Sequence, residues 1–214
     1  MENRTPITVS KAEEKDVQAI AALVIETFSE QEKITQFIIK PSKGNNHKTL
    51  IKLVEFMAKA CIKSSRTILV ARVQDEMVGC AIVKDSNKTC LLKKIKTYFP
   101  RALWLIIPAM KHFNCKNLLS AFRAVRLKQK LDKPYYFLEA LAVHRKYQGQ
   151  GVGRILLSRI DDILIKSKSN RGIYLFTGDL KNKLFYEKVG YKVIEEHTSK
   201  KLTVYHMFKE RPHQ

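Results

Sequence analysis

The chain has 214 residues, a length that suits one well-buried domain and is short for two. Apolar residues make up 45% of the sequence, and only 8 glycines and 6 prolines occur, which excludes extended disorder and predicts a globular fold. A net charge of +20 favours anionic ligands or partners, and the four cysteines form no C-x-x-C pair, as is typical of thiols in a reducing compartment.

Hydrophobic periodicity predicts strands and helices before residue 85. Apolar residues alternate in the strands and recur at helical spacing in the helices, the first of which has acidic residues in its first turn. The predicted elements are a strand over 7–12, helices over 13–29 and 45–62, and two strands over 67–73 and 77–83 that form a hairpin around residues 74–76.

A strongly basic segment of about residues 85–133 follows. From Lys84 to Lys133 the sequence holds 13 Lys or Arg residues against 2 Asp residues, a net charge of +11. A helix is predicted over 117–130, and four aromatic side chains could line a pocket: Tyr98, Phe99, Trp104 and Phe113. Because charge runs usually face water, the segment is either a solvated basic surface or the binding site of an acidic partner.

A predicted strand over 137–143 then enters a turn with regularly spaced glycines. Gly149, Gly151 and Gly153 leave the backbone free of Cβ atoms, so successive N–H groups can close around an anion. The helix that follows points its positive end at the same place, and Arg154 adds a formal charge. We interpret the turn as a cradle for a pyrophosphate group.

Two other phosphate-binding motifs do not fit this turn. A Walker loop ends in Gly-Lys-Ser or Gly-Lys-Thr, a string that the sequence lacks. The dinucleotide fingerprint G-x-G-x-x-G needs a glycine where Arg154 stands, and too few residues remain downstream for a six-stranded parallel fold. The elements predicted after the turn are a helix over 152–164, a strand over 173–176, a helix over 180–189 and two strands over 191–195 and 202–208.

Two motifs and the order of the elements match one known family. Residues 148–153, Gln-Gly-Gln-Gly-Val-Gly, meet the pattern Gln/Arg-x-x-Gly-x-Gly/Ala, and residues 179–191 are similar to the signature N-x-x-A-x-x-F-Y-E-K-x-G-F. These features resemble the GCN5-related N-acetyltransferase (GNAT) superfamily over most of the chain outside the basic segment. The resemblance implies an α/β fold with a mixed, mostly antiparallel twisted sheet and helices on both faces. It also implies a single domain over 1–214, with an insert at about 85–133 between the third and fourth strands.

The resemblance further implies that acetyl-CoA binds along the strand before the glycine turn and in the turn itself. In the family this strand parts from its neighbour at a bulge, and its free N–H groups hold the pantetheine arm and the thioester carbonyl. The residues it assigns to the cofactor are Leu141, Ala142, Val143, Gln148, Gly149, Gln150, Gly151, Val152, Gly153, Arg154 and Asp179. Asp179 stands where the family usually has Asn, so its ionised side chain can accept a hydrogen bond but not donate one.

Glu139 and Tyr186 are the candidate catalytic residues. Glu139 is an acid within an otherwise apolar strand, a costly placement that makes it a candidate general base. Its alternative role is an ion pair with a lysine or arginine of the insert. Tyr186 matches the family tyrosine that faces the cofactor sulfur and returns a proton to the thiolate; its alternative role is an aromatic ring that packs under the cofactor.

The function implied by the resemblance is N-acetyl transfer from acetyl-CoA to the amine of an unidentified small-molecule acceptor, by direct attack in a ternary complex. The alternative is a non-catalytic or regulatory GNAT-fold module whose insert binds a membrane surface or nucleic acid. The histidines show no metal-ligand spacing, and the longest apolar run, 102–110, is far shorter than the roughly 18 residues of a membrane-spanning helix. We therefore expect a cytoplasmic protein without a metal site, and a homodimer remains open.

Overall fold

The computed structural model describes residues 6–39, 46–62, 66–86, 110, 113–129, 131, 134–199 and 202–212. The described strands form one seven-stranded sheet in the order β1-β2-β3-β4-β5-β7-β6, and only the β4–β5 pair is parallel. The strands are β1 (Thr8–Lys11), β2 (Thr67–Val73), β3 (Glu76–Asp85), β4 (Tyr136–Val143), β5 (Gly172–Thr177), β6 (Lys192–Thr198) and β7 (Thr203–Glu210). This mixed, mostly antiparallel sheet confirms the predicted fold class.

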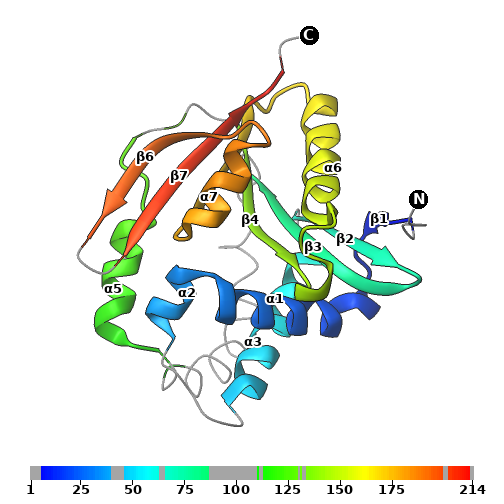
Figure 1. The fold of residues 1–214 in the computed structure, drawn as a ribbon, viewed down its shortest axis with the longest axis horizontal. Coiled ribbons are helices and arrows are strands. Elements are labelled where there is room, and N and C mark those ends of the chain that lie inside the picture. Colours follow the sequence, from blue (N-terminus) through cyan, green and yellow to red (C-terminus); the bar gives the residue numbers. More distant parts are fainter. Residues whose placement is uncertain are drawn as a thin grey trace.

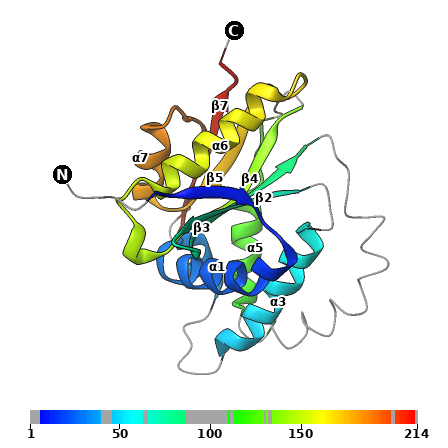
Figure 2. The same ribbon diagram turned by 90° about the vertical axis from the view of Figure 1, so that its right-hand side faces the viewer.

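Helices cover both faces of the sheet, as predicted. On one face lie α6 (Val152–Lys166) and α7 (Leu180–Glu187), and on the other lie α1 (Val17–Gln31), α3 (Asn46–Ile62) and α5 (Cys115–Ala124) (Figure 2). A short helix, α2 (Lys33–Ile38), directly follows α1 below α7 in Figure 1.

Each face has its own hydrophobic core. On the α6 face, Leu156, Ile160 and Leu164 are fully buried at helical spacing. On the other face, Val17 and Ile20 of α1 are equally buried, against β2, β3 and β4. Burying one such side chain contributes about 1.5–3 kcal/mol, so the two cores hold the helix ends in fixed positions relative to β4.

A buried polar network ties α5 to the sheet. His206 of β7 has no exposed surface; its Nδ1 lies 2.6 Å from the Tyr174 hydroxyl and its Nε2 lies 2.9 Å from the Ala124 carbonyl oxygen. A carbonyl can only accept, so Nε2 carries the proton and Nδ1 accepts from the tyrosine. Burial lowers the pKa of His206, which keeps the imidazole neutral and both contacts intact.

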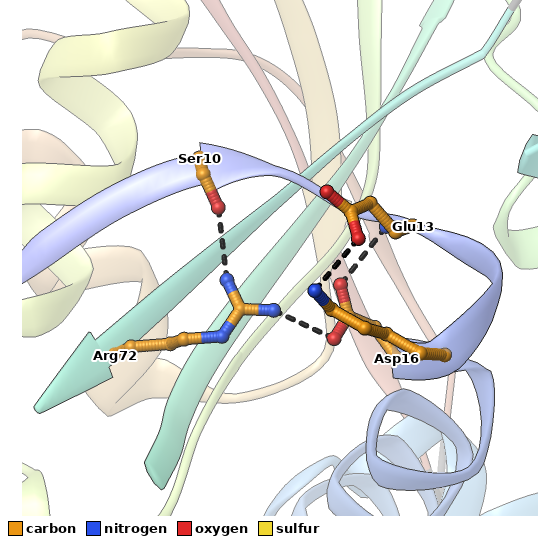
Figure 3. Close-up of polar contacts among 5 residues, drawn as sticks. Ser10, Glu13, Asp16 and Arg72 are labelled. Atoms are coloured by element: carbon orange, nitrogen blue, oxygen red, sulfur yellow. Dashed lines mark hydrogen bonds and ion pairs between the residues drawn. The ribbon is translucent and has the colours of Figure 1, made fainter. Parts of the chain in front are cut away.

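An arginine of β2 fastens the N-terminal strand (Figure 3). The Arg72 guanidinium donates to the Ser10 hydroxyl at 2.8 Å and to the Asp16 carboxylate at 2.6 Å. Asp16 ends the 3-10 helix η1 (Glu14–Asp16), and its second oxygen accepts the Glu13 N–H at 2.9 Å. Burial alone would raise the pKa of Asp16, but Arg72 and the Glu13 N–H together hold that pKa below its usual value.

A bulge and a divergence in the middle of the sheet create space for a ligand. Val83 of β3 pairs with Leu138, and Ile82 pairs with Ala140, so Glu139 is the extra residue of a β-bulge in β4. On its other edge, β4 pairs with β5 only at Tyr136 and Phe137. Beyond Phe137 the two strands part, as the family resemblance implied.

Several predicted boundaries differ from the structure. The helix predicted over 13–29 starts as η1 and ends at Gln31, and α2 was not predicted at all. The helix predicted over 117–130 is α5, which ends at Ala124. Most of the insert, including Tyr98, Phe99 and Trp104, lies outside the described residues. None of the helices that the structure describes is long and apolar enough to cross a membrane.

Candidate active site

A cavity of about 690 Å³ lies where β4 and β5 diverge. Four parts of the chain wall it: the α1–α2 junction, the second half of β4, the glycine turn with the start of α6, and the end of β5 with α7. This volume lies within the range of about 300–1,000 Å³ that is usual for small-molecule sites.

The glycine turn has the conformation that its glycines allow. Gly149 and Gly151 have φ values of 75° and 90°, in the left-handed region that other residues rarely adopt, and Gly151 is the N-cap of α6. A Cβ on either glycine would meet no protein atom within 4 Å. The space beside the turn is therefore open, and the first N–H groups of α6 lack intrahelical partners and can bind an anion there.

Most of the residues predicted to bind the cofactor line this cavity. Those that do are Leu141, Val143, Gln148, Gly149, Gly151, Val152, Gly153 and Arg154. Ala142, Gln150 and Asp179 are not among the described lining residues. Ala142 has no exposed surface and packs in the core on the α1 face, although its backbone belongs to the same strand.

Two glutamine side chains donate hydrogen bonds to backbone carbonyls in and before the turn. The Gln148 side chain donates to the Val143 carbonyl oxygen at 3.0 Å, and the Gln150 side chain donates to the Lys146 carbonyl oxygen at 2.9 Å. Both amides therefore fix the path of the backbone around the glycines.

Asp179 caps α7. One carboxylate oxygen accepts the N–H groups of Lys181 at 2.7 Å and Asn182 at 3.2 Å, which satisfies two of the unpaired donors at the helix start. This aspartate fixes the start of the helix that carries Tyr186.

Glu139 faces the cavity from the bulge of β4 and is held by an arginine. The Arg66 guanidinium, just before β2, donates from Nε to one carboxylate oxygen at 2.6 Å and from Nη2 to the other at 3.0 Å. The exposed fractions of the two side chains are 15% for Arg66 and 23% for Glu139. The predicted alternative for Glu139 was an ion pair with the insert, but its partner lies before the insert.

Tyr186 faces the same cavity from α7. Its side chain is 9% exposed, and its ring packs against those of Phe185 and Tyr191, with centroids 5.3 and 5.5 Å away. Burial raises the pKa of Tyr186, and the negative charge of Glu32 raises it further. The phenol is therefore protonated at neutral pH.

Glu32 is a cavity residue that sequence reasoning missed. It lies between α1 and α2 and accepts hydrogen bonds from the other side of the cavity, from Gly178 and Thr177 at the end of β5 and from Asn182 of α7. The sequence gives no signal for this role, because Glu32 lies in the polar stretch Ser29-Glu30-Gln31-Glu32-Lys33 and its partners are about 150 residues away along the chain.

Neither Cys61 nor Cys80 is among the residues that line this cavity. Both are buried, and burial raises the pKa of both thiols, for Cys80 to about 12. Among the described residues, no three His, Cys, Asp or Glu side chains gather as a metal site.

One part of the sequence matches a known family. Residues 120–193 match the family described as Acetyltransferase (GNAT) domain. No curated protein matches the sequence.

Similar folds occur in solved acetyltransferases. The histone acetyltransferase HPA2 and related acetyltransferase of Corynebacterium glutamicum is 20% identical with a TM-score of 0.65, and the alignment covers 97% of this chain and 98% of that one. An N-acetyltransferase of Staphylococcus aureus is 19% identical over 94% and 99% of the two chains, with a TM-score of 0.57. The protein yncA of Salmonella typhimurium, solved with its cofactor acetyl-CoA, is 14% identical over 98% and 96%, with a TM-score of 0.54.

The matched region runs from α5 through the glycine turn, α6 and α7 to the start of β6, and so includes every motif that carried the resemblance. Residues 120–193 thus match the GNAT acetyltransferase domain in sequence, and the described chain shares the fold of solved acetyltransferases, as the resemblance implied.

Proposed function

We propose that the protein transfers an acetyl group from acetyl-CoA to the amine of a small-molecule acceptor within a ternary complex. One observation carries the proposal: a single cavity is lined by the glycine turn and by both candidate catalytic side chains, Glu139 and Tyr186. The match of residues 120–193 to the GNAT acetyltransferase domain supports acyltransferase activity, and yncA, a protein of similar fold, was solved with acetyl-CoA as its cofactor.

In this proposal the cofactor lies along the glycine turn and β4. Its pyrophosphate binds the N–H groups at the start of α6, next to Arg154. Its pantetheine arm lies beside β4 beyond Phe137, where the sheet leaves one edge of the strand without a neighbour, and pairs there as a short extra strand would. A backbone N–H of that edge polarises the thioester carbonyl.

The chemistry then needs one proton acceptor and one proton donor. The amine nitrogen attacks the thioester carbonyl carbon, the carbon–sulfur bond breaks, and the proton that leaves the nitrogen goes to Glu139, directly or through water. Arg66 occupies two of the roughly four lone-pair sites of that carboxylate and fixes its orientation, which leaves sites for a donor in the cavity. Tyr186 gives its proton to the departing thiolate.

The raised pKa of Tyr186 is compatible with this role. Burial disfavours a phenolate and a thiolate alike, as the buried Cys80 thiol of this protein illustrates with a pKa of about 12. A coenzyme A thiolate released into the same cavity is destabilised in the same direction. The proton transfer between the two groups is therefore less uphill than the raised pKa of the phenol alone suggests.

Direct attack is favoured over a covalent enzyme intermediate. The described residues of the cavity wall include neither cysteine nor serine, the side chains that most often carry an acyl group in a covalent intermediate. They also include no histidine that could activate the hydroxyl of a wall threonine.

The test is a thiol-release assay with acetyl-CoA and a panel of small amines, polyamines, amino acids and peptides. We expect amine-dependent release of coenzyme A, and mass spectrometry of the acceptor should detect one added acetyl group. Hydrolysis of acetyl-CoA at the same rate with and without every amine would contradict the proposal.

A second candidate function has support from α5. Leu119 and Phe122 lie on its outer face with exposed fractions of 60% and 62%, next to the exposed cations Lys116 and Arg123. Apolar and basic side chains on one helix face are typical of binding to an anionic membrane surface. Salt-sensitive retention on anionic vesicles that is lost in a Leu119→Ser, Phe122→Ser double variant, without amine-dependent turnover, would favour a binding module.

A further inference from the structure

The Glu32 carboxyl group lines the cavity and accepts three hydrogen bonds across it. Its Oε1 accepts the Gly178 N–H at 2.8 Å, and its Oε2 accepts the Thr177 hydroxyl at 3.2 Å and the Asn182 amide at 3.3 Å. The Gly178 N–H can only donate, and in this structure the hydroxyl and the amide donate as well. Three donors on one carboxyl group suit its ionised form, and they fix it against the end of β5 and the start of α7.

This carboxylate lacks a cationic partner within the described part of the chain. Glu139 has Arg66, but all the described partners of Glu32 are uncharged. The two cations on the described cavity wall, Arg154 and Lys181, make no ion pair with it. Burial accordingly raises the pKa of Glu32, against the effect of its hydrogen-bond donors. Glu32 is partly buried, and a partly desolvated carboxylate without a counter-ion is costly, so a ligand that brings a positive charge relieves that cost.

Glu32 also lies close to the proposed reaction centre. It lines the cavity together with Tyr186, and its charge affects the pKa of that phenol. A group bound to Glu32 is therefore held near the point where we place the cofactor sulfur.

We propose that Glu32 is the counter-ion for a positively charged group of the acceptor, and that the cavity selects amines that carry a cation in addition to the amine that is acetylated. The inference rests on the proposed acetyl transfer and names its substrate class. Glu32 would supply recognition, while Glu139 and Tyr186 supply proton transfer.

The experiment compares three primary amines of similar length: 1,4-diaminobutane, 4-amino-1-butanol and 4-aminobutanoate. Because the diamine has two equivalent amines, its kcat/KM is divided by two before the comparison. Their second groups are cationic, neutral and anionic. With the parent protein we expect kcat/KM to fall in that order. In Glu32→Gln, kcat/KM for the diamine should fall by at least about 10-fold, as is usual when one partner of a desolvated charge pair is removed. The order among the three acceptors should then be lost, while acetyl-CoA affinity stays near the parent value.

Two further variants separate recognition from folding. Glu32→Asp keeps the charge and should keep the preference for the diamine, even if its shorter side chain lowers the rate. Glu26→Gln removes a carboxylate from α1, the helix that ends just before Glu32, outside the described cavity wall, and should leave the preference unchanged. Thermal unfolding of each variant reports whether loss of the Glu32 contacts to β5 and α7 has disturbed the fold.

The outcomes distinguish failure of this inference from failure of the proposed function. Turnover with the same order of acceptors in the parent and in Glu32→Gln would overturn the inference and leave acetyl transfer standing. If none of the three acceptors reacts, calorimetry with 1,4-diaminobutane and the coenzyme A complex decides. Binding that Glu32→Gln weakens would support the cation subsite without the activity, and absence of binding would overturn the subsite.

Discussion

Replacing Gly151 and Gly190 by alanine, one at a time, separates the effect of backbone strain from the effect of lost cofactor contact. Gly151 and Gly190 have nearly equal φ values of 90° and 93°, but Gly151 lies in the cavity and Gly190 lies beyond the end of α7, outside the described cavity wall. A Cβ at 151 would meet no protein atom within 4 Å, and one at 190 would make only ordinary contact with Lys209 at 3.4 Å. Both changes should therefore cost about 1–2 kcal/mol of strain in the folded state. For a chain of this size that cost lowers Tm by about 2–8 °C.

Only one of the two variants should lose the cofactor. The Cβ at 151 enters the open space beside the turn, where we place the pyrophosphate, so Gly151→Ala should weaken acetyl-CoA binding by at least about 10-fold, equivalent to about 1.4 kcal/mol. Gly190→Ala should bind acetyl-CoA as the parent does. Calorimetric titration of both folded variants measures the difference. Equal losses of Tm with equal acetyl-CoA affinities would refute the assignment of the glycine turn to the cofactor.

Three further predictions concern single side chains. Tyr186→Phe keeps the ring but removes the proton, so kcat should fall on the order of 100-fold while acetyl-CoA affinity changes little; a rate within a few-fold of the parent would return Tyr186 to a packing role. Glu139→Gln should lower kcat at temperatures where the variant is fully folded. If the pair with Arg66 were purely structural, Glu139→Gln and Arg66→Lys would lower Tm by similar amounts and leave kcat unchanged. Because the pKa of Asp16 is lowered in the folded state, its pair with Arg72 should stabilise the parent over Asp16→Asn above about pH 5, and this advantage should disappear as the pH falls through the lowered pKa. Urea unfolding of both proteins from pH 7 to pH 3 measures it, and a difference that grows in acid would contradict the assigned direction.

The local features of this fold could be predicted from the sequence, because local patterns determine them. The apolar patterns predicted all seven strands in order, and the spacing of Gly149, Gly151 and Gly153 predicted a turn that leads into α6. The short helix α2 was missed because its six residues, Lys33–Ile38, are too few for a periodic pattern to stand out.

The partners of the cavity residues could not be predicted, since they are contacts between distant parts of the chain. Glu139 is 73 residues from Arg66, and Glu32 is 150 residues from Asn182. An arginine just before a strand and an acid between two helices carry no local signal of such pairing. These groups meet in one cavity because β4 diverges from β5. The divergence starts after the two parallel pairs, Tyr136 with Ile173 and Phe137 with Tyr174.

The most direct test of acetyl transfer is to follow an isotope-labelled acetyl group from acetyl-CoA into an amine. The parent protein should move the label into an amide of at least one cationic amine, in equal amount to the coenzyme A released, and Tyr186→Phe should do so far more slowly. Binding of acetyl-CoA without label in any amine of the panel would contradict the account and leave a GNAT-fold binding module.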